Sequence, residues 1–117
     1  SGGGSSWENS GDLVVGQLGD GTLAIESGGA VSNATGHIGF SPGSIGTITV
    51  TGENSSWTNH STLVVGNYGT GRLTVAQGGV VSSEDGGIGI QAGSFGTVTV
   101  RDVGSIWTMV NDLVIGR

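Results

Sequence analysis

The sequence predicts an all-β fold, a right-handed parallel β-helix (β-solenoid) with about 25 residues and three short strands in each coil. Three observations predict it. A strand pattern returns at a constant interval, a Trp returns at twice that interval, and 26 of the 117 residues are Gly, with a single Pro. Such a period is typical of stacked repeats, because each copy buries its apolar face only against its neighbours. The handedness follows from the preference of parallel strand crossovers.

The first strand pattern is clearest at residues 46–50, Gly-Thr-Ile-Thr-Val. Its apolar residues alternate with polar ones, which is the pattern of a strand with one buried face. The pattern returns at 21–25, 71–75 and 96–100 without insertion or deletion. A Gly opens every copy, which predicts a corner where the backbone needs positive φ or close approach. These residues are Gly21, Gly46, Gly71 and Gly96.

A second strand precedes each of these copies. It reads Leu13-Val14-Val15-Gly16 in one coil and Ile38-Gly39-Phe40 in the next, and the two versions then alternate. The constant interval predicts two inward ladders of apolar side chains along the axis. The first ladder is Leu13, Ile38, Leu63, Ile88 and Leu113. The second ladder is Val15, Phe40, Val65, Ile90 and Ile115.

A third short strand carries Trp7, Trp57 and Trp107 in every second coil, which makes the full unit a 50-residue double repeat. The chain is therefore interpreted as a single β-solenoid segment, residues 1–117. Its repeat units are 7–56 and 57–106, and its partial repeats are 1–6 and 107–117. Such an array has open coil ends, through which copies could stack head to tail or pair along strand edges.

The ordered motifs at 55–59 (Ser-Ser-Trp-Thr-Asn), 63–66 (Leu-Val-Val-Gly) and 96–100 (Gly-Thr-Val-Thr-Val) carry a resemblance. Together they resemble the repeat of type V secretion (autotransporter) passenger domains and of some PEP-CTERM-associated proteins of bacteria. The resemblance covers essentially the whole chain. It implies an exported, extracellular or cell-surface right-handed β-helix with no defined enzymatic activity. The open-ended repeat and the lack of a unique polar cluster predict a structural role as a stalk, fibre or adhesin passenger, with a host surface or a glycan as candidate partners.

The composition excludes several other classes. Three Arg, no Lys and a net charge of −6 cannot form the basic surface that nucleic acids require. The absence of Cys excludes disulfides and Cys-based metal sites. No apolar run approaches the roughly 20 residues of a transmembrane helix.

The titratable residues predict neither an enzyme nor a cofactor or metal site. A calcium-binding repeat roll keeps an Asp in every turn, whereas Asp20 is replaced by other residue types in the following coils. Glu84 and Asp85 remain a candidate pair for an ion, and His37 and His60 lie in turns that favour a surface position. An inactive polysaccharide-processing β-helix stays open as an alternative, since active members need clustered carboxylates.

Two binding alternatives depend on outward side chains. Trp7, Trp57 and Trp107 could stack on sugars in a carbohydrate-binding module, although their regular recurrence favours packing inside a corner. Thr-x-Thr pairs such as Thr47 and Thr49 resemble the array of ice-binding β-helices. Arg72 interrupts that array, and the ordinary β-propensity of Thr explains the pairs better.

Overall fold

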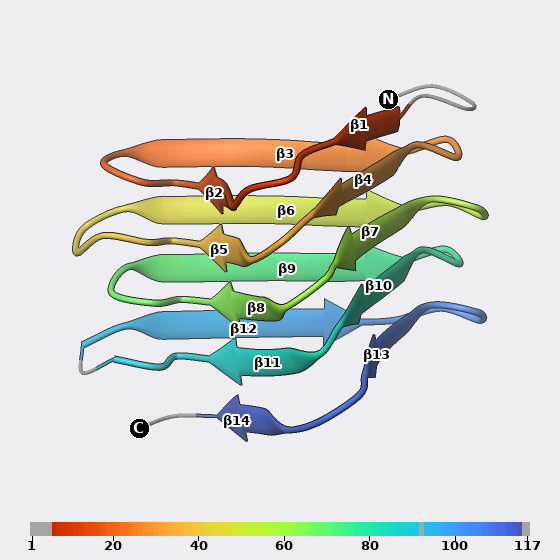
Figure 1. Ribbon diagram of the computed structural model, residues 1–117. Helices are drawn as coiled ribbons and strands as arrows, with labels where there is room; N and C mark the ends of the chain where they lie inside the picture. Colours follow the sequence, from red (N-terminus) through yellow and green to blue (C-terminus); the bar gives the residue numbers. More distant parts are fainter. Residues whose placement is uncertain (1–5, 92, 116–117) are drawn as a thin grey trace.

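A computed structural model describes residues 6–91 and 93–115, and within them every regular element is a β-strand. The strands form three parallel sheets, two of five strands and one of four (Figure 1). Sheet A contains β1 (Ser6–Glu8), β4 (Ala30–Asn33), β7 (Ser56–Asn59), β10 (Val80–Ser83) and β13 (Ile106–Met109). Sheet B contains β2 (Leu13–Val15), β5 (Gly36–Ile38), β8 (Thr62–Val65), β11 (Asp85–Ile88) and β14 (Leu113–Ile115). Sheet C contains β3 (Asp20–Glu26), β6 (Ile45–Thr51), β9 (Thr70–Ala76) and β12 (Phe95–Val100).

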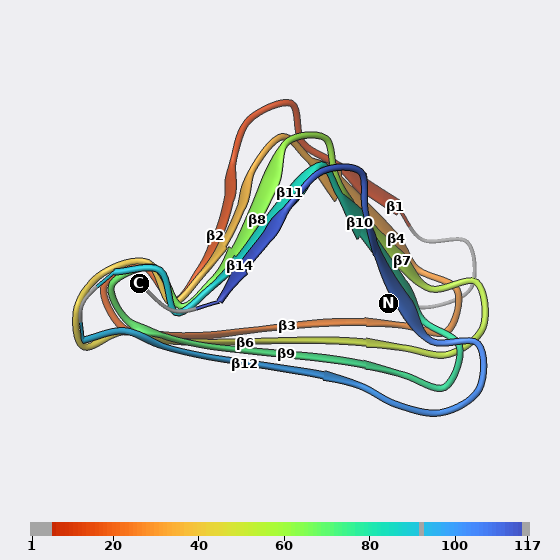
Figure 2. The same ribbon diagram turned by 90° about the horizontal axis from the view of Figure 1, so that it is seen from below.

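The three sheets are the sides of a triangular solenoid (Figure 2). Seen from the end toward which the chain advances, the path runs anticlockwise from sheet A to sheet B and then to sheet C. This path is right-handed, so the predicted right-handed β-solenoid with three strands per coil is confirmed. Of the predicted partial repeats, only Ser6 of 1–6 is described, and 107–117 is described as far as Ile115.

Sheet C keeps the predicted repeat interval throughout. Gly21 pairs with Gly46, Gly46 with Gly71 and Gly71 with Gly96, so the predicted glycine column is confirmed. A Cβ at Gly46 would collide with the backbone oxygen of Val15, which explains why this corner admits no side chain. In the two interior strands of this sheet, β6 and β9, the inward residues Ile48, Val50, Leu73 and Val75 are almost completely buried.

Sheet B does not follow the constant interval, and the predicted ladder of Leu13, Ile38, Leu63, Ile88 and Leu113 is wrong. Ile38 pairs with Val15 and Val65. Leu13 and Leu63 both pair with Gly36, which lies in the coil between them. The observed inner columns are Leu13, Gly36, Leu63, Gly86 and Leu113, and Val15, Ile38, Val65, Ile88 and Ile115. Phe40 and Ile90, which were predicted to lie in the second ladder, follow the strands instead.

The physical reason is an alternation between two kinds of coil. In sheet A, Trp7, Trp57 and Trp107 alternate with Val31 and Val81 in one column. We call the coils that contribute these residues Trp coils and Val coils. The prediction that a Trp occupies this position in every second coil is thereby confirmed.

The large indole of a Trp coil is accommodated by a Gly of the Val coil before it. A Cβ added at Gly36 would lie 2.5 Å from Oδ1 of Asn59, 2.7 Å from Cζ2 of Trp57 and 3.1 Å from Cδ1 of Leu63. The same arrangement recurs at Gly86, where a Cβ would lie 2.7 Å from Sδ of Met109 and 2.8 Å from Cζ2 of Trp107. At these two inward positions a Trp coil therefore carries Trp in sheet A and Leu in sheet B, whereas a Val coil carries Val and Gly. The register of sheet B pairs each Leu with a Gly.

We expect Gly36→Ala to destabilise the protein by about 1–3 kcal/mol, because the new methyl group overpacks the space that the Trp57 ring and the Asn59 amide fill. Gly19→Ala is the matched control, since a Cβ at Gly19 meets nothing within 4 Å. Urea denaturation followed by circular dichroism gives both values. Equal stability of the two variants would contradict the packing of Trp57 over Gly36.

Candidate functional site

The most conspicuous polar group of the molecule lies inside the solenoid, beside Trp57. The indole Nε1 of Trp57 donates a hydrogen bond of 2.6 Å to Oδ1 of Asn33. The Nδ2 of Asn33 donates to Oδ1 of Asn59 at 2.8 Å, and Nδ2 of Asn59 donates to the backbone oxygen of Ser82 at 3.3 Å. Asn33 and Asn59 are buried neighbours in sheet A. This continuous chain of hydrogen bonds satisfies the buried polar atoms around Trp57 and thereby allows its ring to pack in the core.

The second repeat uses a simpler version of the same arrangement. Nε1 of Trp107 donates to Oγ of Ser83 at 3.1 Å, and Ser83 takes the place that Asn33 has in the first repeat. Met109 occupies the position in the second repeat that Asn59 occupies in the first, so the second repeat has no pair of Asn side chains here. The indoles of Trp57 and Trp107 therefore each find one hydrogen-bond acceptor in the preceding coil. This role of Asn33 and Ser83 was not predicted, although each precedes its Trp by the same interval in the sequence.

The three Trp side chains do not form an exposed row for sugars. Trp57 is 0% exposed, and Trp107 is half-buried. The predicted glycan contact is therefore wrong for Trp57, because its ring lies in the core between adjacent coils, as corner packing requires. Only Trp7, in the first coil, is substantially open to solvent, at 47%.

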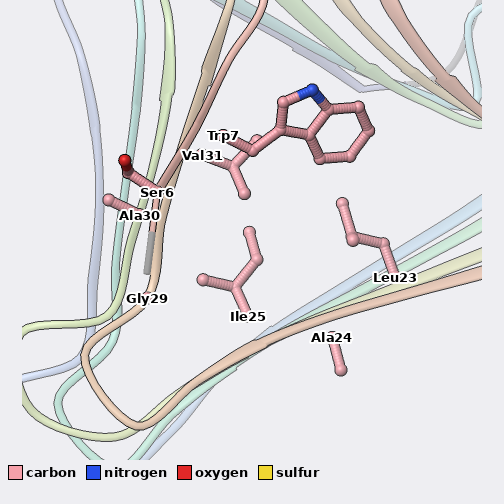
Figure 3. Close-up of a pocket in the computed structure, with 8 residues that line it drawn as sticks. All are labelled: Ser6, Trp7, Leu23, Ala24, Ile25, Gly29, Ala30 and Val31. Carbon is pink, nitrogen blue, oxygen red and sulfur yellow. The ribbon is translucent and has the colours of Figure 1, made fainter. Parts of the chain in front are cut away.

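Trp7 borders a small apolar hollow at the open end of the core (Figure 3). The hollow measures about 110 Å³, and Figure 3 shows the indole across from Leu23 and Ile25, with Val31 beside it. A second hollow of about 240 Å³ lies between Trp7 and Leu13 on the side of sheet B. Neither hollow is lined by a titratable side chain, so both expose core that a further coil would cover.

A third hollow, of about 340 Å³, lies on the outer face of sheet B. Val64, Ile90 and Val114 line it, and Asp85 and Asp112 also contribute. The carboxylate of Asp85 accepts a hydrogen bond from the backbone nitrogen of Asp112 at 3.3 Å. Among residues 6–91 and 93–115, no group of three or more His, Cys, Asp or Glu side chains is arranged to hold a metal ion. The candidate pair Glu84 and Asp85 thus gains no third acidic or His ligand in the described chain.

The two His side chains differ in their surroundings. His60 is exposed, as predicted for a surface turn residue, whereas His37 lies in β5 on the outer face of sheet B and is half-buried. The His37 ring packs edge-on against Phe40, with centroids 4.9 Å apart, and its Nδ1 is buried without a hydrogen-bond partner among the described residues. Burial lowers the pKa of His37 below its usual 6.5, and the Asp12 carboxylate opposes this effect only in part.

The outward Thr side chains line up on sheet C. Thr22, Thr47 and Thr97 share one column with Arg72, and Thr49, Thr74 and Thr99 share another with Ala24. Arg72 is exposed in the middle of this face and interrupts the array, as the sequence predicted.

No known protein family matches the chain, and comparisons with curated proteins and with solved structures found no significant match. The described part of the chain contains no helix that is long and apolar enough to cross a membrane.

We expect Asn33→Ala to cost about 2–4 kcal/mol of stability, because it leaves both the Trp57 indole N–H and the Asn59 amide oxygen buried without partners. Asn33→Ser should cost roughly half as much, since a hydroxyl can accept from the indole as Ser83 does in the second repeat. Urea denaturation measures both variants. If Asn33→Ser is as unstable as Asn33→Ala, the hydrogen bond to Trp57 has no stabilising role.

The lowered pKa of His37 predicts a loss of stability on acidification. Below pH 6.5 the unfolded chain takes up a proton that native His37 resists, so unfolding becomes more favourable until the pH passes the lowered native pKa. The His37→Val variant has no ring to take up this proton on unfolding, and its new Val lies in a column with Val14 and Val64. The stability difference between His37→Val and the parent should therefore grow as the pH falls from 7.5 to 5.

Thermal unfolding at several pH values measures this difference, and His37→Gln is the control. His37→Gln removes the titrating ring without adding an apolar contact. Its stability should therefore depend on pH in the same way as that of His37→Val, but at a lower stability than His37→Val. A difference that does not change with pH would contradict the burial of the His37 ring.

Proposed function

We propose that the chain is a structural β-solenoid segment of a bacterial surface or secreted protein, where it acts as a stalk, fibre or adhesin passenger. The observation that carries the proposal is the continuity of the core. The same inner columns run through every described coil, and the recurring geometry serves stacking at Gly36, Trp57 and Asn33. A protein whose buried polar groups satisfy one another in this way is suited to keep a fixed shape.

The distribution of polar side chains supports a structural and not an enzymatic role. The exposed carboxylates are dispersed over several coils, and His37 packs on Phe40 instead of facing a carboxylate pair. The location outside the cell rests on the motif resemblance and on the absence of Cys from the sequence. A β-helix that processes polysaccharides has less support, because such chemistry needs paired carboxylates at a fixed separation.

Self-association through the open ends is part of the proposal. The first coil exposes Trp7 and part of Leu23, and the last strands expose Val100 and Ile115. Unpaired strand edges with apolar side chains are templates for pairing with another chain. Of the three Trp side chains on which the carbohydrate-binding alternative depends, Trp7 alone is largely open to solvent, which is too little for a row of sugar contacts.

A rod-forming repeat predicts that length grows in proportion to the number of units. Adding four tandem copies of residues 57–106 after residue 106 preserves the alternation of coils and adds eight layers. At about 4.8 Å for each layer, the axis should lengthen by about 38 Å with an unchanged cross-section. Small-angle X-ray scattering measures both quantities, and an increase in cross-section without an increase in length would contradict the proposal.

The proposed location has a separate test. Antibodies against this segment should label intact cells of the source organism, and external protease should remove the label while a cytoplasmic marker survives. Labelling that requires permeabilised cells would count against a surface role, unless the protein is recovered from the medium.

A further inference from the structure

The hollow of about 340 Å³ on the outer face of sheet B owes its shape to one small residue. Strands β8, β11 and β14 lie side by side there (Figure 1), and Val64, Gly87 and Val114 form one outward column. Adjacent layers are about 4.8 Å apart, so the two Val side chains are separated by the space that one intervening side chain would fill. Gly87 supplies no such side chain, and the hollow forms at this position.

The first repeat fills the equivalent position with a ring of its own. His37 stands in the column between the Val residues of the two neighbouring coils, as Gly87 does in the second repeat. The His37 ring packs edge-on against Phe40, with centroids 4.9 Å apart. Ile90 takes the place of Phe40 in the second repeat, where its Cδ1 would lie 2.5 Å from a Cβ at Gly87. Ile90 thus covers the Gly from one side, and the second repeat has no ring at the place where the first repeat has one.

The rim of the hollow is apolar on one side and acidic on the other. Val64, Ile90 and Val114 form the apolar side. Asp85 and Asp112 form the acidic side from adjacent strands, and a carboxylate oxygen of Asp85 lies 3.3 Å from the backbone nitrogen of Asp112. Like charges on neighbouring strands repel each other, so a cation between these two carboxylates is favourable.

The charge of the rest of the molecule favours the same kind of ligand. The chain has a net charge of −6, which raises the concentration of cations near its surface. Of the Arg side chains in the described part of the chain, Arg72 lies on the outer face of sheet C and Arg101 follows β12, so neither lines the hollow. A positively charged ligand therefore meets two carboxylates beside an apolar wall.

We propose that this hollow binds a small amine that carries a planar apolar ring. The ring lies between the two Val side chains of the column, where the first repeat places the ring of His37. The ammonium group donates hydrogen bonds to the carboxylates of Asp85 and Asp112. The volume lies at the lower end of the range of about 300–1,000 Å³ that is typical of ligand sites, which suits a ligand with a single ring. This inference goes beyond the proposed structural role and does not depend on it.

Three probes of similar shape test the two sides of the hollow separately. Phenethylamine carries both the ring and the positive charge, phenethyl alcohol carries the ring alone, and phenylacetate carries the ring with a negative charge. In a heteronuclear NMR titration of the whole chain at low salt, phenethylamine should shift the backbone amides of Gly86, Gly87 and Ile90 with a Kd of about 1 mM. The alcohol should bind about tenfold more weakly, phenylacetate should not bind, and added salt should weaken the amine alone. Equal binding of amine and alcohol, or no shift of these amides with the amine, would overturn the proposal.

Asp85→Asn removes one charge of the rim and keeps an oxygen that accepts from the backbone nitrogen of Asp112. It should weaken phenethylamine about fivefold, the effect of one unit charge at about 4 Å in water, and should leave phenethyl alcohol unchanged. Asp20→Asn is the matched control, because it makes the same change of charge at an exposed position of β3 outside the hollow. An equal loss of affinity in both variants would show that the amine responds to the net charge of the chain and not to this site.

The double variant Gly87→His/Ile90→Phe tests the position of the ring. It transfers the ring pair of the first repeat into the hollow, so it should abolish binding of phenethylamine. Circular dichroism establishes that this variant is folded, and binding that persists in the folded variant overturns the proposal. If the double variant does not fold, the comparison of Asp85→Asn with Asp20→Asn decides the question.

Discussion

The packing of the Trp57 indole over Gly36 is the constraint on which the rest of this solenoid depends. The ring shares its sheet A column with Val31 and Val81, but it also reaches over the sheet B position of the preceding coil, where a Cβ would lie 2.7 Å from its Cζ2, so that position must be Gly. This requirement makes two successive coils unequal, so the structural unit is a pair of coils and not a single one. Sheet C, which carries no Trp, keeps a uniform register, whereas sheets A and B shift back and forth with the alternation.

The polar groups in the core follow from the same constraint. A buried indole N–H needs an acceptor, and the coil before each buried Trp supplies one, Asn33 in the first repeat and Ser83 in the second. Asn33 brings a second amide, Asn59, into the core, whereas Ser83 does not. Each pair of coils is thereby joined by apolar contact and by directional hydrogen bonds. This combination resists sliding of one coil over the next.

The sequence was sufficient to predict the solenoid, the glycine column at Gly46 and the recurrence of Trp, because each of these follows the period directly. The register of sheet B could not be obtained by counting, since Ile38 is equally apolar beside Leu13 or beside Val15. The signal that distinguishes the two is Gly36, a Gly at an inward strand position where a Cβ would collide with the Asn59 amide and the Trp57 ring. The same reasoning identifies Trp57 as a core residue, which hydrophobic alternation alone does not separate from a binding residue.

The most direct measurement of this account is the backbone register between β2 and β5 in solution. Nuclear Overhauser effects between amide and α protons of neighbouring strands report which residues are paired. If the ring of a Trp coil sets the register, Val14 will show these contacts with His37, as in the pairing of Leu13 with Gly36 and of Val15 with Ile38. Contacts of Val14 with Gly39 would instead indicate that sheet B keeps the same constant interval as sheet C, and the alternation of coils described here would be incorrect.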